Sequence, residues 1–203
     1  MAPRPALEPH TPPGLGAASA EPTDDGLIAR AGRGDRAAWN ALVARHLPDL
    51  VALGWYVLAD RGEAEDVAQE AFLRLVRKVD TWEPGGAQLK TWLHRVAVNL
   101  CIDRKRIKRA AREPLDSDAA MSVAAPDALE AFDRRRAVAR ALRAIPERQR
   151  AAVVLVYYQG FSNKEAAHML DVGLEALESL LSRARRALKE RLKHVIDDIG
   201  VAP

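Results

Sequence analysis

The sequence has little cysteine and few aromatic residues. Of 203 residues, one is a cysteine, Cys101, and 5% are aromatic. A single cysteine excludes an internal disulfide and fits a reducing compartment, so we expect a cytoplasmic protein. The uninterrupted apolar runs are far shorter than the roughly 20 residues that cross a bilayer, and the start lacks the charged and then apolar pattern of a secretion signal. We therefore expect a soluble protein.

Motifs typical of enzymes and metal sites are missing as well. No Gly-rich phosphate loop or nucleophile elbow occurs, and the five histidines are scattered without metal-ligand spacing. We expect no enzymatic activity, no cofactor and no metal. His94 and His168 are expected on helix surfaces. Cys101 is expected to be a small buried apolar residue rather than a redox switch, and Trp92 is expected in the core.

Charge is segregated along the chain although the net charge is only +3. Between residues 60 and 70, acidic residues are opposed by the single Arg61, whereas from 95 to 112 basic residues are opposed by the single Asp103. An acidic segment offers acceptors to a basic partner, and a basic segment suits nucleic acid.

Apolar residues recur at helical spacing from Thr23 onward and do not alternate as in a strand, which predicts an all-α fold. The N-terminal helices are expected at 24–32, 35–60 and 61–79, with Pro48 as a break or kink, and Thr91 is expected to cap a further helix. Four parts are predicted: a disordered Pro/Ala-rich tail at 1–22, a helical domain at 23–110, a flexible acidic linker at 111–130, and a second helical domain at 131–203.

The second domain has the pattern of a helix-turn-helix. Its helices are expected at 128–145 and 147–158, and Ser162 with Glu165 forms a capping box before a helix at 163–170. A tight turn at 171–173 leads into a long basic helix from Leu174 to about Ile196. In such a pair the second helix enters the major groove of DNA, so this domain is predicted to bind DNA.

Several motifs occur in a set order: AEDVAQEAFLRL, TWLHRVAVNLCIDRKR, IPERQRAAVVLVYYQGFSNKEAAHML and LLSRARRALK. Together they resemble the extracytoplasmic-function group of bacterial sigma factors, the dissociable subunits that direct RNA polymerase to promoters. The likeness covers about residues 24 to 194. It implies three partners: core polymerase, promoter DNA and an anti-sigma protein.

The resemblance also implies site residues. The helix from Ala64 would dock on the clamp helices of the largest polymerase subunit through Glu65, Asp66, Gln69 and Glu70. The loop and basic helix that follow would recognise and open the -10 element with Trp82, Lys90, Arg95, Asn99, Arg104, Lys105 and Arg106. The long C-terminal helix would read the -35 element with Glu178, Ser179, Ser182, Arg183 and Arg186. Acidic linker residues would mimic nucleic acid in a polymerase channel: Glu113, Asp116, Asp118 and Asp127.

Glu178 departs from the family, because many members carry a basic residue there. A carboxylate accepts from cytosine N4 but repels phosphates, so the change affects which promoter is read or weakens binding. Glu175 lies on the same helix, and its effect is open. Two alternatives follow: a sigma-like decoy that titrates an anti-sigma protein, and a stand-alone helix-turn-helix regulator.

Overall fold

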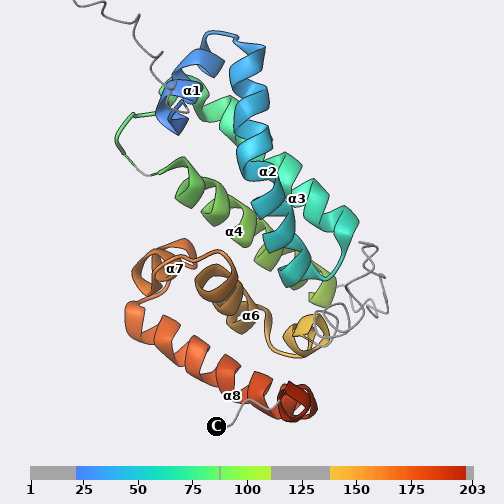
Figure 1. The fold of residues 1–203 in the computed structure, drawn as a ribbon. Coiled ribbons are helices and arrows are strands. Elements are labelled where there is room, and N and C mark those ends of the chain that lie inside the picture. Colours follow the sequence, from blue (N-terminus) through green and yellow to red (C-terminus); the bar gives the residue numbers. More distant parts are fainter. Residues whose placement is uncertain (1–21, 87, 111–137, 200–203) are drawn as a thin grey trace, which may run out of the picture.

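The computed structural model describes residues 22–86, 88–110 and 138–199, and its regular elements there are helices (Figure 1). The predicted all-α fold is confirmed. The predicted tail, apart from Pro22, and the whole acidic linker with its four acidic residues lie outside the described residues.

The N-terminal half is a four-helix bundle in which α2 packs against each of the other three helices. Asp35 caps α2 by accepting from the backbone N–H groups of Ala37 and Ala38, and Asp60 caps α3 through Glu63 N. At Gly54 a Cβ would lie 2.9 Å from the Ala64 Cα, so only glycine allows α2 and α3 to approach this closely. The elements are α1 (Asp24–Gly32), α2 (Arg36–Leu58), α3 (Arg61–Lys78), the 3-10 turn η1 (Val79–Thr81) and α4 (Leu89–Ala110).

Helix α2 continues through Pro48, so of the predicted break or kink the break does not occur. Leu42, before Pro48, and Leu50 and Leu53, after it, are fully buried. Their packing keeps both segments in one helix although proline has no backbone N–H to donate within the helix. By length and composition alone α2 could also cross a membrane. It also packs against three neighbouring helices, as the central helix of a bundle does.

Helix α4 begins earlier than the sequence suggests. Leu89 is buried and forms part of its first turn, so Thr91 lies inside the helix and is not its cap. The loop between η1 and α4 is therefore shorter than the sequence suggests.

The C-terminal half contains the predicted helix pair. The capping box of Ser162 and Glu165 forms as expected, and Asp171 adopts φ 53° in the tight turn that follows α7. The expected helix at 147–158 is α-helical only to Val153 and then widens into a π-helix. The described elements are a helical segment at 138–143, α6 (Glu147–Val153), η3 (Val154–Tyr158), α7 (Asn163–Met169) and α8 (Leu174–Ile199).

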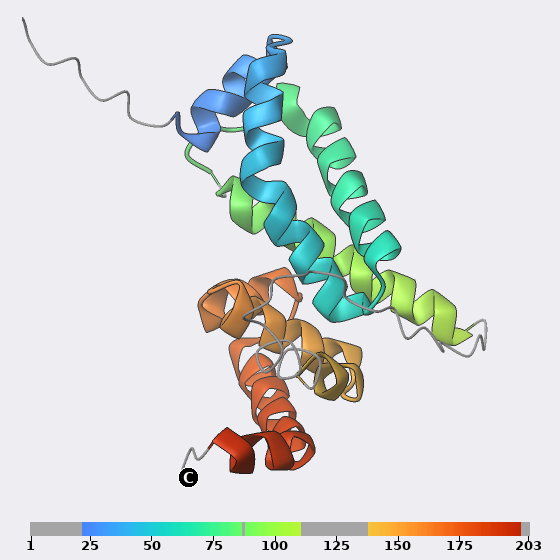
Figure 2. The same cartoon turned by 45° about the vertical axis from the view of Figure 1, so that its right-hand side comes forward.

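The two halves pack against each other. Helix α4 contacts α6 and α7, and α2 contacts α6 and η3. Helix α8 lies on the far side of the C-terminal half, away from the bundle (Figures 1 and 2). The interface between the halves therefore involves α4 but leaves α8 outside it.

Candidate functional site

Helix α3 presents the predicted docking residues on a face that points away from the core. Asp66 and Gln69 are exposed, whereas Glu65 pairs with Arg61 and Glu70 pairs with Arg74. The opposite face is buried through Val67, Ala71, Phe72 and Leu75.

Two apolar residues that the sequence analysis missed extend this face. Leu73 and Val76 are each 50% exposed, and Leu73 follows Gln69 by one helical turn. Leu73 lies three residues after Glu70 and four after Gln69, and Val76 lies three after Leu73; this helical spacing was the available signal. The surface is therefore acidic and apolar, which suits a basic helix with an apolar side.

The acidic and basic segments partly neutralise each other. Glu63 of α3 pairs with Lys108 of α4, and its backbone carbonyl accepts from Arg104 at 2.9 Å. Arg104 also lies 3.8 Å from Asp66. Lys105 is half-buried. Its pKa is lowered mainly by this burial and to a smaller extent by the positive charge of the nearby Arg150. Of the three expected cations at 104–106, only Arg106 is largely exposed, and it pairs with Asp103.

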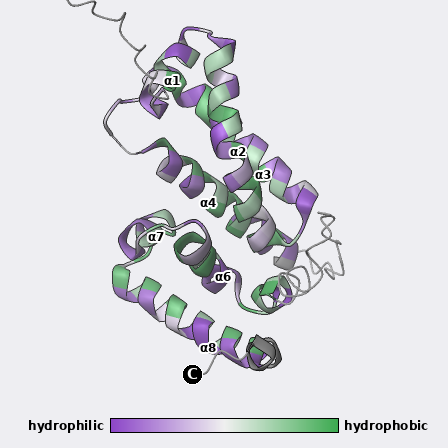
Figure 3. Ribbon diagram, in the orientation of Figure 1, coloured by the Kyte–Doolittle hydropathy of each residue, from purple (hydrophilic) through white to green (hydrophobic). Residues whose placement is uncertain are grey.

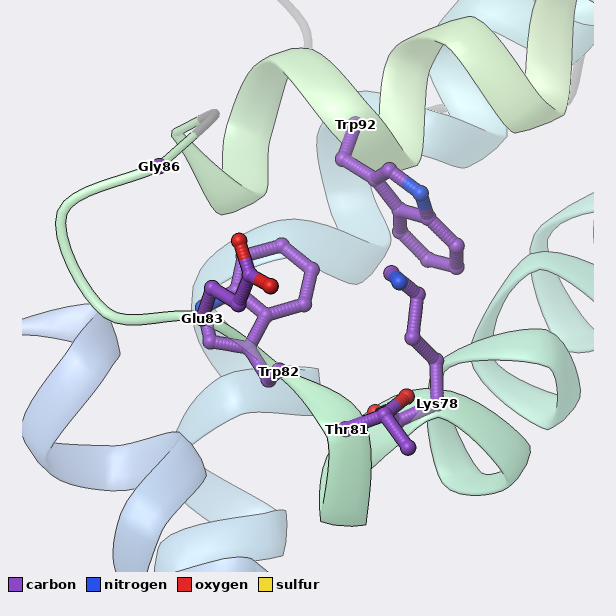
Figure 4. Close-up of a pocket in the computed structure, with 6 residues that line it drawn as sticks. All are labelled: Lys78, Thr81, Trp82, Glu83, Gly86 and Trp92. Carbon is purple, nitrogen blue, oxygen red and sulfur yellow. Dashed lines mark hydrogen bonds between the residues drawn. The ribbon is translucent and has the colours of Figure 1, made fainter.

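A pocket of about 260 Å³ lies between η1, the following loop and the start of α4 (Figure 4). The rings of Trp82 and Trp92 stand edge to face with centroids 5.9 Å apart, and the Lys78 side chain points toward Trp92. Trp92 is half-buried, so it serves both the core and this wall. We call this the indole pocket; its lining residues are Lys78, Thr81, Trp82, Glu83, Gly86 and Trp92.

Two of the expected -10 residues lie in the interface between the halves. The Lys90 Nζ is 5.3 Å from the ring centroid of Phe161, a cation-π distance. The Arg95 guanidinium is 3.1 Å from Nε2 of the exposed His168. Asn99, one turn further along α4, is half-buried. The C-terminal half thus contacts part of the α4 face on which a DNA strand was expected.

His94 is completely buried between these two cations, so its predicted surface position is wrong. Its Nδ1 is 2.8 Å from Lys90 O, its Nε2 is 3.2 Å from Gln159 Oε1, and its ring meets Phe161 edge to face. Burial lowers the pKa of His94. The error arose because periodicity within α4 cannot reveal that the C-terminal half covers this face.

Arg150 makes a further buried polar contact across the interface. Its guanidinium donates to Val57 O at 2.6 Å, near the end of α2, and to Arg143 O and Ile145 O in its own half. Burial lowers its pKa to about 10. Within the motif IPERQR this arginine is indistinguishable from a surface residue, so sequence reasoning missed it.

Helix α8 keeps its expected DNA face accessible. Glu178, Ser182, Arg183 and Arg186 are exposed and Ser179 is half-exposed. Leu177, Leu181 and Ala184 are buried against the rest of the C-terminal half, which contacts α8 through α6 and α7. Figure 3 shows hydrophilic and hydrophobic residues interspersed along α8. The structure therefore separates an accessible α8 face from a covered α4 face.

Comparison with protein families identifies both halves. Residues 42–112 match the family model of sigma-70 region 2, and residues 135–188 match that of sigma-70 region 4.

Individual relatives agree with these matches. The ECF RNA polymerase sigma factor SigM of Mycobacterium tuberculosis is 33% identical over 89% of this chain and 90% of its own length. The ECF RNA polymerase sigma-E factor of Escherichia coli is 30% identical over 86% of this chain and 96% of its own.

Two solved structures share the fold. CnrH in complex with the cytosolic domain of CnrY superposes with a TM-score of 0.63 at 28% identity, covering 84% of this chain and 97% of CnrH. The sigma factor RpoE in complex with the anti-sigma factor NepR from Bartonella quintana superposes with a TM-score of 0.60 at 29% identity. The match covers 76% of this chain and 96% of the other chain.

Proposed function

The chain belongs to the ECF RNA polymerase sigma factors, and we propose that it binds core polymerase and directs transcription from promoters with -35 and -10 elements. Members of this family are initiation factors without catalysis of their own, so the chain is not an enzyme. The observation that carries the proposal is the presence of two exposed faces of opposite character, the acidic and apolar face of α3 and the basic face of α8.

Core polymerase would dock on α3. Asp66 and Gln69 offer acceptors to basic residues of the clamp helices, and Leu73 and Val76 add apolar area beside them. Glu65 and Glu70 would exchange their intramolecular arginine partners for polymerase cations, which costs little because exposed ion pairs contribute only about 0–1 kcal/mol.

Promoter opening would use the indole pocket and α4. An extruded base needs an aromatic surface for stacking and polar groups at its edge, because unstacking costs a few kcal/mol. Trp82 and Trp92 supply the rings, and Lys78 supplies a cation. Lys90, Arg95, Asn99, Arg104, Lys105 and Arg106 would follow the displaced strand.

The -35 element would be read by α8. Arg183 and Arg186 would contact phosphates or guanine, and Glu178, Ser179 and Ser182 would contribute to base choice. In this proposal residues 23–110 form the polymerase-docking and -10 domain and residues 131–203 form the -35 domain. The acidic linker at 111–130 would enter a basic channel of the polymerase.

The packed halves cannot read both elements at once. The -35 and -10 elements lie about 25 base pairs apart, which is about 85 Å of duplex. A compact protein of this length has a radius of gyration of only about 17 Å. The halves would therefore separate on core polymerase, releasing Lys90 from Phe161 and Arg95 from His168.

We also assign this chain an anti-sigma partner and a cytoplasmic location. The similar CnrH and RpoE structures are complexes with CnrY and with the anti-sigma factor NepR. A partner that binds both halves would hold them together and keep α4 covered.

Run-off transcription tests the proposal. Purified bacterial core polymerase, with and without this protein, would be supplied with fragmented DNA of the source genome. We expect new discrete transcripts that share two spaced upstream elements. Core binding without any new start site would favour the decoy function, and absence of core binding would favour a stand-alone regulator.

A further inference from the structure

Asp25, in the first turn of α1, connects that helix to the loop beside the indole pocket. Its Oδ1 accepts from the indole Nε1–H of Trp82 at 3.2 Å, and its Oδ2 accepts from the backbone N–H of Gly85 at 3.1 Å. These partners lie 57 and 60 residues further along the chain. One carboxylate therefore holds both a pocket wall and the backbone of the loop.

Helix α1 is itself firmly anchored, so Asp25 is a fixed point. The neighbouring Asp24 binds Arg45 at 2.7 Å and His46 at 2.9 Å, both on α2. Leu27 and Ile28, on the inner face of α1, are buried in the core. The two adjacent aspartates point to different partners: Asp24 attaches α1 to the core, and Asp25 extends that attachment to the loop.

The loop needs such a fixed point because its own sequence defines its shape weakly. Gly85 has φ +77°, a conformation that glycine adopts freely, and Gly86 follows it. Glycine loses much conformational freedom on ordering, and a site ordered before binding avoids this cost when the ligand arrives. An indole offers a single hydrogen-bond donor, so Asp25 uses the only polar group by which the Trp82 ring can be oriented.

We propose that Asp25 is a positioning residue for the indole pocket: it fixes the Trp82 ring and the 82–86 loop so that the pocket accepts one extruded -10 base with a defined preference. This inference rests on the proposed function of the pocket. Asp25 lies outside residues 42–112, the part of the chain that matches the family model of sigma-70 region 2.

The test uses the full chain assembled with core polymerase. The probe is the non-template strand of the -10 region from a promoter found by run-off transcription, with each of the four bases placed in turn at every position. The measured quantity is the ratio of affinities among bases at each position. For Asp25→Ala we expect this ratio to fall about tenfold at one position, since a charged acceptor with two donors is lost. Core binding and -35 duplex binding should stay as in the wild type.

Asp80→Asn is the matched control, because it removes the same charge from the adjacent and exposed turn η1. It should leave base preference unchanged. Asp25→Asn retains a carbonyl acceptor and should fall between wild type and Asp25→Ala. In the Trp82→Phe background, which lacks the indole N–H, Asp25→Ala should have a clearly smaller effect than in the wild-type background.

The outcomes separate this inference from the proposed function. If the wild-type complex discriminates bases and both Asp25 variants discriminate equally well, Asp25 does not position the pocket. The same conclusion follows if Asp25→Ala lowers core binding, -35 binding and -10 binding by one common factor, because Asp25 would then only stabilise the fold. Should wild-type protein give no promoter-specific transcripts, the proposed function itself fails.

Discussion

The Nε2 atom of His94 in α4 lies 3.2 Å from the Oε1 atom of Gln159, which follows η3 in the other half of the protein. The same Gln159 side chain donates through Nε2 to Asp49 O in α2, also at 3.2 Å. One amide thus joins the C-terminal half to two helices of the bundle. Lys90 and Arg95 lie on either side of His94 in α4 and also contact the C-terminal half. We therefore expect that loss of the His94–Gln159 contact would also expose these two cations.

Gln159→Ala should favour separation of the halves. It removes two hydrogen bonds, each with a net value of about 1 kcal/mol. Without core polymerase, the variant should bind a single-stranded -10 oligonucleotide several-fold more tightly than wild type does, as measured by fluorescence anisotropy. Lys164→Ala, at an exposed position on α7, provides the control. Equal affinity of wild type and Gln159→Ala would mean that the interface does not limit access to α4.

Arg150→Met should strongly destabilise the fold. Three backbone carbonyls would lose a charged donor at a buried site, and we expect the free energy of unfolding to fall by about 3 kcal/mol. Chemical denaturation measures this quantity. Arg148→Met changes an exposed arginine of the same helix and should alter stability by less than about 0.5 kcal/mol. A similar small change for both variants would contradict the role assigned to Arg150.

Acid should weaken the packed arrangement through His94. The folded protein holds the pKa of this residue below 6.5, so the unfolded chain binds the extra proton first as the pH falls. The free energy of unfolding should therefore decrease below about pH 6.5, and this part of the decrease should be absent in His94→Phe. Melting curves of both proteins between pH 8 and pH 5 provide the measurement.

Cys101 should be chemically inert in the folded protein. Burial raises the pKa of its thiol to about 12, and the reactive species is the thiolate. At pH 7.5 a thiol reagent should label the native protein far more slowly than the denatured protein. Rapid labelling of the native state would indicate that α4 opens readily.

Arg186→Ala should weaken -35 binding mainly through charge. If the side chain contacts one phosphate, the slope of log affinity against log salt should fall by about 0.9. Titration of a -35 duplex at several salt concentrations measures it. Arg33→Ala removes a charge from the exposed turn after α1 and should leave the slope unchanged. If the slope is unchanged in Arg186→Ala as well, Arg186 does not contact the phosphate backbone of the DNA.

Most of the helical elements of this protein could be predicted from its sequence. Helical periodicity predicted the all-α fold, the Ser162 and Glu165 capping box predicted the start of α7, and the ordered motifs predicted the family. These features depend on neighbours within a few residues, which the sequence shows directly. The -10 and -35 residues remain predictions.

The way in which the helices cover one another could not be predicted from the sequence and is visible only in the folded chain. Burial of His94, the inward position of Arg150 and the contact between Asp25 and Trp82 join residues separated by more than fifty positions. The period of a single helix reveals which face is apolar but not which distant element packs on a polar face. For the same reason the sequence indicated a continuous basic track on α4, whereas the fold places Lys90 and Arg95 at the interface and Arg104 against α3.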